Sequence, residues 1–202
     1  MSSGPGAADL ADAYRADGYV ARPEVVPPGL ANYLAGCLDL MAEAGRLEPD
    51  AAVAGSWSIY GDPVFDLLLR PLTPIVAEHV GAEVVPTYSF ARLYTEGAEL
   101  VVHTDRPACQ HSVSLLLGAT ADEPWPLLLT DLHGTTVTVV QEPGDGLCYQ
   151  GTVLPHWRTP FTGRWHGQVF LHFVEADGPF ADHVFDGRPG LGLPAATKDG
   201  TP

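Results

Sequence analysis

Apolar residues in the first half of the chain recur at the spacing of amphipathic helices. In the segment 29–45, Leu34, Leu38 and Met41 follow one another at intervals of three and four residues, an arrangement that gathers side chains on one helix face. The segment 63–80 has the same spacing. The two segments therefore predict two helices, each with an apolar face that packs against another layer of the fold.

Proline residues and a turn-rich stretch interrupt this helical part. Pro71 and Pro74 lie inside the second helix, and we expect them to break or kink it because proline removes a backbone hydrogen bond. The segment 49–62, PDAAVAGSWSIYGD, lies between the two helices and predicts a loop that carries Trp57 and Tyr60.

From Glu83 onward the pattern changes to short apolar or alternating runs separated by turn residues, which is typical of strands. The expected strands are 84–94, 99–104, 111–118, 125–129, 135–140, 146–150 and 167–174. This order of elements predicts a mainly β fold with flanking helices, a double-stranded β-helix (jelly roll) with the N-terminal helices packed on one sheet. A sandwich of another topology is the alternative, since strand order cannot be read from one sequence.

The length of 202 residues favours a single domain. Within it we expect a helical part at about 7–82, a jelly-roll core at about 83–175 and an irregular tail at about 176–202. With 46% hydrophobic and 17% charged residues, the chain has the composition of a globular protein.

Charge and residue counts exclude whole classes of function. The chain has 25 acidic and 10 basic residues, a net charge of −15, so nucleic acids and anionic membranes are not expected partners. The one lysine, Lys198, lies near the C-terminus, which disfavours a Schiff-base enzyme. The three cysteines form no C-x-x-C pair, which argues against a disulfide framework or a cysteine zinc site. With no signal-peptide pattern and no apolar run of ~20 residues, the sequence predicts a soluble cytoplasmic protein.

One small group of residues has the composition of a metal site. His103 and Asp105 are separated by one residue, and in a strand such residues point to the same side. His156 follows the turn-rich stretch 151–155 and could complete the group. Two histidines and one carboxylate on one face form the facial triad of non-haem Fe(II) oxygenases, which leaves coordination positions open for a co-substrate and dioxygen.

The order and spacing of the motifs around this group add to the picture. Along about 84–174 the chain reads RLYTEG, HTD, SVSLLL, PGD, the histidine at 156, GRW and FLH. In this order the chain resembles the 2-oxoglutarate/Fe(II)-dependent oxygenase superfamily, most nearly its prolyl-hydroxylase-like branch. The resemblance implies that His103, Asp105 and His156 ligate Fe(II), with 2-oxoglutarate and O2 as co-substrates.

The implied reaction is hydroxylation of an unactivated C–H bond, with release of succinate and CO2. The expected substrate is a small molecule, such as an amino acid or a natural-product intermediate, and a carboxylate on it could meet one of the arginines named below. Halogenating relatives have Gly or Ala in place of the acid, so Asp105 disfavours halogenation. Desaturation, cyclisation and epimerisation use the same kind of site and stay open.

The resemblance also implies a basic residue that binds the far carboxylate of 2-oxoglutarate. Arg164, eight residues after His156, fits this role, because an arginine can form bidentate bonds to a carboxylate. Many relatives have the basic residue about ten positions after the histidine, which here is His166, and Arg158 is the competing candidate. Tyr94 lies where relatives often place a tyrosine near the co-substrate. A further candidate hydrogen-bond donor to the co-substrate is Ser114.

Candidate substrate-binding residues are less sharply defined. Arg106 directly follows Asp105 and could meet an anionic substrate. Arg92 shares a strand face with Tyr94, and it binds either a ligand anion or a protein acid such as Glu99 or Asp131. Trp57 and Tyr60 could line a pocket or pack as ordinary aromatic residues.

Two other functions fit the same sequence. One is an iron enzyme of cupin-like architecture that does not use 2-oxoglutarate and therefore needs no arginine for it. The other is a non-catalytic jelly-roll binding module in which the His-x-Asp sequence has arisen by chance.

Overall fold

The computed structural model describes residues 7–195 as three α-helices, eleven strands and two short 3-10 helices, η1 and η2. In chain order these elements are α1 (Ala7–Asp17), β1 (Tyr19–Arg22), α2 (Pro28–Glu43), β2 (Glu48–Pro49), β3 (Ser56–Tyr60), α3 (Pro63–Val80), β4 (Val84–Tyr94), β5 (Leu100–His103), η1 (Pro107–Cys109), β6 (His111–Thr120), β7 (Leu127–Thr130), β8 (Thr136–Val139), β9 (Gly146–Tyr149), β10 (His156–Arg158), β11 (Trp165–Glu175) and η2 (Ala181–Gly187).

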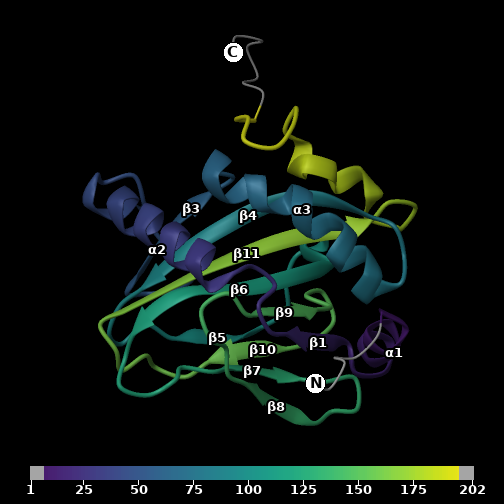
Figure 1. Ribbon diagram of the computed structural model, residues 1–202, viewed down its shortest axis with the longest axis horizontal. Coiled ribbons are helices and arrows are strands. Elements are labelled where there is room, and N and C mark those ends of the chain that lie inside the picture. Colours follow the sequence, from purple (N-terminus) through teal and green to yellow (C-terminus); the bar gives the residue numbers. More distant parts are fainter. Residues whose placement is uncertain (1–6, 196–202) are drawn as a thin grey trace.

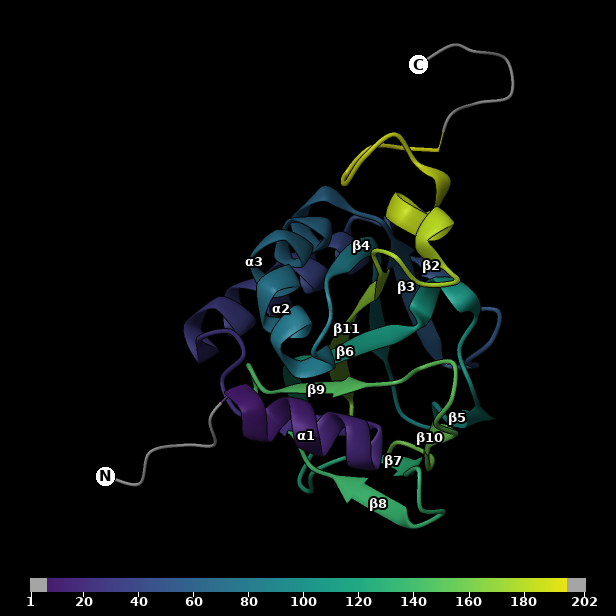
Figure 2. The same ribbon diagram turned by 90° about the vertical axis from the view of Figure 1, so that its right-hand side faces the viewer.

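The strands form two antiparallel sheets. The larger sheet has the order β1-β9-β6-β11-β4-β3-β2, and the smaller has the order β5-β10-β7-β8. The two sheets lie on opposite sides of a shared interior, while α2 and α3 cover the outer face of the larger sheet (Figures 1 and 2). The predicted jelly roll with helices packed on one sheet is therefore confirmed.

Alternation along β11 divides its side chains between two environments. Val169, Leu171 and Phe173 are buried in the cluster that α2 and α3 form with the sheet. His166 and His172, on the opposite face, point into the space between the sheets, where His172 lines a pocket. The period of two along this strand thus places apolar residues against the helices and polar residues in the interior.

The helix α3 is continuous from Pro63 to Val80, so the expected break at Pro71 and Pro74 is wrong. Asp62 starts the helix by accepting a hydrogen bond from the amide of Val64, and Gly81 ends it in the left-handed conformation. The face that includes Leu68, Leu69, Leu72 and Val76 is buried against the sheet. Packing of this face offsets the backbone hydrogen bonds that the two prolines remove.

The segment 49–62 is not only a loop, because it contains β3. Ser56 and Ser58 are buried while Trp57 between them is half-exposed, and the strand pairs with β4 along five residues. The alternation is short and the buried side chains are polar, so the pattern of apolar residues did not predict a strand here. Neither α1, β1 nor the three-residue β10 is among the predicted elements.

The structure adds further elements to the expected parts of the chain. The part expected to be helical, 7–82, also contains β1, β2 and β3, and the expected irregular tail contains η2. Lys198 lies outside the described residues. Among residues 7–195, no helix combines the length and the hydropathy needed to span a bilayer.

Candidate metal centre

Strand pairing brings the two histidines together. His103 is the last residue of β5, His156 is the first residue of β10, and the two are direct partners in the antiparallel register. Opposite residues of an antiparallel pair project to the same face, and the two imidazole centroids lie 4.2 Å apart. The pairing of β5 with β10 therefore brings together two residues that are 53 positions apart in the sequence.

Asp105 joins them from a different kind of segment. It lies beyond the end of β5, so the expectation that His103 and Asp105 share a strand face is wrong. The two side chains nevertheless converge, for a different reason. A hydrogen bond from the Asp105 amide to the carbonyl of Gly151, 2.8 Å long, holds the segment in place. Gly151 precedes β10, so the same turn positions both His156 and Asp105.

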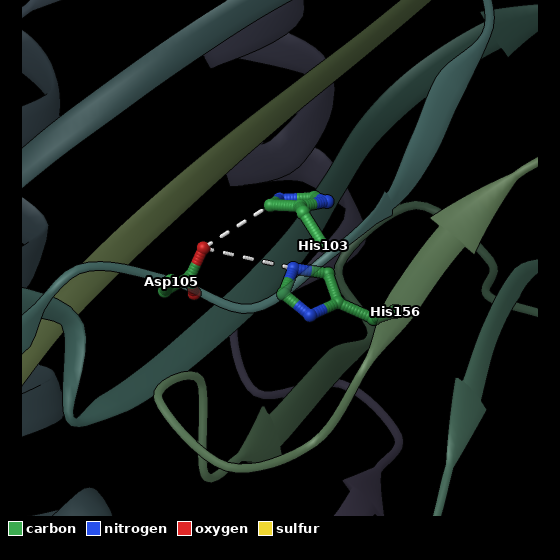
Figure 3. Close-up of side chains that lie close together, drawn as sticks. All are labelled: His103, Asp105 and His156. Atoms are coloured by element: carbon green, nitrogen blue, oxygen red, sulfur yellow. Dashed lines mark ion pairs between the residues drawn. The ribbon is translucent and has the colours of Figure 1, made fainter.

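The three side chains point toward one centre (Figure 3). Oδ1 of Asp105 lies 3.7 Å from Nε2 of His103 and 3.7 Å from Nε2 of His156. The three ligand atoms all lie within 4.8 Å of one another, so one ion can contact all of them. Two imidazole nitrogens and one carboxylate oxygen are the donor set of the facial triad.

Backbone carbonyls orient both imidazoles. Nδ1 of His103 lies 2.9 Å from the carbonyl oxygen of Val101, and Nδ1 of His156 lies 3.0 Å from that of Leu154. Because a carbonyl only accepts, Nδ1 donates in both rings, and in the neutral imidazole this leaves the lone pair of Nε2 facing the centre. Burial lowers the pKa of His156 to about 4. This ring is therefore neutral, as a metal ligand must be, at physiological pH.

A second row of polar groups holds the other oxygen of Asp105. The Ser112 hydroxyl donates to Oδ2 over 3.2 Å and lies 2.9 Å from Nδ1 of His172. Burial lowers the pKa of His172 to about 4, so its neutral ring can donate from Nδ1 to the serine oxygen. A Cβ at Gly151 would clash with the same Oδ2, which explains the need for glycine at this position.

The triad opens onto a pocket of about 300 Å³. Aromatic side chains supply much of its wall, and two arginines add positive charge; these residues are Tyr88, Phe90, Tyr149, Phe170, Arg92 and Arg106. Tyr149, whose hydroxyl lies 3.4 Å from Nε2 of His156, and His172 belong to the site but are not among the predicted site residues. The alternating pattern of β9 and β11 places both of them in the interior.

Arg92 lines the pocket, but its protein partner is neither Glu99 nor Asp131. Nε of Arg92 forms a 2.8 Å ion pair with the buried carboxylate of Asp50, and Nη1 donates to the Tyr94 hydroxyl over 3.1 Å. Tyr94 is fully buried at this position. The charge of Arg92 is therefore already balanced by the protein.

Arg158 and Arg164 have opposite environments. Arg164 is exposed and borders a surface depression away from the triad. Arg158 is 1% exposed, and its guanidinium donates to two neutral acceptors: the carbonyl of Trp125 and, at 3.4 Å, Oε1 of Gln168. Its Nε has no partner among the described residues. Burial lowers the pKa of Arg158 to about 10, and a buried cation without an anion is costly unless a ligand supplies one.

The other predicted positions lie around this arginine or outside the pocket. His166 is buried, and its Nε2 donates to the amide oxygen of Gln168 over 2.9 Å, while burial and Arg158 lower its pKa to about 3. The Ser114 hydroxyl accepts from Gln168 over 2.7 Å. Trp57 and Tyr60 are 39% and 44% exposed and do not line the pocket, although the Tyr60 ring lies 4.9 Å from that of Tyr88.

Comparison with known structures identifies proteins that have the same fold. No protein-family model and no curated protein matches the sequence. A prolyl-4-hydroxylase from Pseudomonas putida is 18% identical with a TM-score of 0.71, covering 84% of this chain and 99% of that chain. The epimerase SnoN in complex with Fe3+, α-ketoglutarate and nogalamycin RO has a TM-score of 0.72 at 13% identity, covering 84% of each chain. AviO1 from Streptomyces viridochromogenes has a TM-score of 0.66 at 19% identity, covering 88% of this chain and 99% of that chain. The chain therefore has the jelly-roll fold of the 2-oxoglutarate/Fe(II) oxygenases.

Proposed function

We propose that this protein is an Fe(II)- and 2-oxoglutarate-dependent dioxygenase that hydroxylates an unactivated C–H bond of a small molecule. The observation that carries the proposal is the convergence of His103, Asp105 and His156 on one centre beside a pocket, at the open end of a jelly roll. The same fold in a prolyl-4-hydroxylase and in an epimerase that holds iron and α-ketoglutarate supports it.

The residues present fit a ferrous ion. Nε2 of His103 and Nε2 of His156 face the centre because Nδ1 of each ring is engaged by a carbonyl, and Asp105 adds a carboxylate oxygen. Among the described residues, the group around this centre consists of three protein ligands and no fourth. The side that faces the pocket is therefore accessible to ligands from solution. Fe(II) with 2-oxoglutarate supplies the O2-dependent oxidation of the substrate, with succinate and CO2 as products.

Within this proposal, Arg158 rather than Arg164 binds the far carboxylate of 2-oxoglutarate. Arg158 lies two residues after His156 on the same strand, so both side chains project into the interior. Its charge acts on Tyr149 and on His156, although the guanidinium lines a second pocket, beside Trp125 and His166, and not the triad pocket. A carboxylate at this position would supply the anion that the protein does not.

The arginine also separates this function from the two alternatives. A cupin-like iron enzyme that does not use 2-oxoglutarate has no need for a buried cation without an acid partner on the strand that carries one of its metal ligands. A non-catalytic module has no need for two histidines whose Nδ1 atoms are both engaged so that Nε2 faces a carboxylate. Both features are present together here.

An anaerobic titration tests the proposal. Adding Fe(II) and then 2-oxoglutarate to the wild type should produce a weak visible charge-transfer band, and Asp105→Ala should abolish it. Arg158→Gln should raise the 2-oxoglutarate concentration that gives the half-maximal band by about tenfold or more, whereas the matched surface variant Arg164→Gln should leave it unchanged. Iron binding without a response to 2-oxoglutarate would indicate the cupin-like enzyme, and absence of metal binding would indicate the non-catalytic module.

A further inference from the structure

A carboxylate of the protein's own chain lies at the mouth of the triad pocket. Asp186, in η2, forms a bidentate ion pair with Arg106, with N–O distances of 2.9 and 2.6 Å. The Tyr60 hydroxyl donates to the same carboxylate. Arg106 directly follows the metal-ligand candidate Asp105, lines the pocket, and stacks 4.6 Å above the ring of Tyr88. Figure 2 shows η2, in yellow, lying over the ends of β3 and β4.

The backbone around Asp186 is strained. Phe185 and Asp186 have φ values of 52° and 55°, in the left-handed region that residues with a Cβ adopt only at an energetic cost. Gly187 follows with a φ of 73°. Two consecutive non-glycine residues in this region persist only where surrounding contacts hold them, and such strain gathers at ligand clamps and switch regions.

The contacts that hold Asp186 are few and polar. All residues of η2 remain at least partly exposed. Arg188, the residue after η2, is anchored by an acid of its own: it is 6% exposed and pairs with the buried Asp66 at 2.7 Å. The chain is thus fixed at Arg188, whereas the Asp186 carboxylate is held by the side chains of Arg106 and Tyr60. Arg188 also lies 5.2 Å over the Tyr60 ring, so the anchor borders the site that the Asp186 carboxylate occupies.

We propose that Arg106 and Tyr60 form an anion-binding site for the substrate, and that Asp186 occupies this site as a tethered carboxylate until a substrate carboxylate replaces it. The planar fork of arginine matches a carboxylate with two oxygens, and Asp186 shows that such a group fits. This assignment rests on the proposed oxygenase function and adds the substrate class: a small molecule with a carboxylate, recognised at the pocket mouth.

The tether makes the proposal measurable. A carboxylate fixed on the same chain competes at an effective concentration in the mM range or above. A free carboxylate therefore binds weakly to the wild type and more tightly once the competitor is removed. Asp186→Asn removes the charge, and Asp186→Gly also removes the side chain; both residues tolerate a positive φ, so neither change adds strain to η2.

Calorimetry with benzoate, on the full chain without metal or 2-oxoglutarate, tests this. Both Asp186 variants should bind benzoate about tenfold or more tightly than the wild type. Asp182→Asn, an exposed aspartate on the same segment, is the matched control and should bind as the wild type does. Adding Arg106→Gln to Asp186→Asn should abolish the gain.

Two results would overturn the assignment. One is equal benzoate affinity in the wild type and both Asp186 variants; the other is a gain that survives Arg106→Gln, which would place the benzoate elsewhere, for example at Arg158. Circular dichroism of each variant verifies folding. The measurement uses neither iron nor turnover, so a failure here is distinguishable from a failure of the proposed oxygenase function, which the anaerobic titration reports.

Discussion

The seven-stranded sheet has two faces of different composition, although the same strands build both. Toward α2 and α3, strands β6 and β11 present Val113, Leu115, Val169 and Leu171, which form part of the main apolar cluster. Toward the smaller sheet, the neighbouring positions of these strands are Ser112, Ser114, His166, Gln168 and His172, all buried as well.

The two faces differ in how burial of their side chains is stabilised. On the helix face, burial itself stabilises the fold, because apolar side chains leave water. On the interior face, burial is costly unless each polar group has a partner, and here the partners form chains such as His172–Ser112–Asp105 and Arg158–Gln168–Ser114. We infer that stability resides mainly in the helix face and chemistry in the interior face.

Substitution of the metal-ligand candidates should give the largest difference between the two faces, a loss of activity with little change in stability. Asp105→Ala or His103→Ala should reduce succinate production by roughly a thousandfold or more, since each removes a ligand of the essential ion. Thermal unfolding should stay within a few degrees of the wild type, because neither side chain belongs to an apolar cluster. His133→Ala, an exposed histidine, serves as the control. Full turnover in either ligand variant would refute the assignment of the triad.

On the helix face of the larger sheet we expect the opposite outcome, a loss of stability with activity retained. Leu171→Ala removes a fully buried side chain of the helix face and should lower the free energy of unfolding by about 2–5 kcal/mol. Below its melting temperature, succinate production per folded molecule should remain near that of the wild type. Denaturant unfolding and turnover of the same sample test this, with the exposed Leu40→Ala as control. A variant of normal stability that lacks activity would contradict the division between the faces.

The two interior arginines allow a finer comparison. Arg92 balances the buried carboxylate of Asp50, so Arg92→Leu leaves that acid without its cation and should cost about 2 kcal/mol of unfolding free energy. Arg158 has no acid partner among residues 7–195, so Arg158→Leu should leave the stability of the ligand-free protein unchanged or higher. Urea unfolding without metal or co-substrate measures both. A large loss of stability in Arg158→Leu would mean that its role is structural.

How much of this could be read from the sequence depends on the range of the interactions. The alternation along β11 and β6 is local, so the strands and their two faces follow from a period of two. The pairing of His103 with His156 depends on strand register, which the chain does not display, yet the residue types in family-like order indicated it. The anchoring of Asp105 by Gly151 and the partner of Arg92, Asp50, come from loops 46 and 42 residues away.

The choice between Arg158 and Arg164 shows the same limit. Both are arginines close to His156, and the family resemblance favoured Arg164, which the structure places at the surface. What distinguishes Arg158 is that it forms no ion pair with an acid in the described part of the chain. That property belongs to the packed interior, since it depends on Trp125, Gln168 and the neighbouring strand at once.

The smallest expected effect concerns His111, the residue that departs from the pattern by placing a polar ring on the helix face of β6. It is 4% exposed, its Nδ1 lies 2.7 Å from the Tyr14 hydroxyl of α1, and burial lowers its pKa to about 4. The unfolded chain binds a proton near pH 6.5 that the folded chain does not. Stability is therefore fully present above about pH 6.5 and decreases as the pH falls toward 4.

Replacing this ring should flatten the pH dependence. Between pH 7 and pH 5, His111→Gln should lose about 1–2 kcal/mol less unfolding free energy than the wild type, because glutamine can keep a hydrogen bond to Tyr14 without taking up a proton. The measurement is urea unfolding of the metal-free protein at both pH values. His133→Gln, on the surface, should retain the wild-type slope. If both variants match the wild type, the acid sensitivity of the fold comes from the other buried histidines, among them His79 of α3, whose pKa burial also lowers.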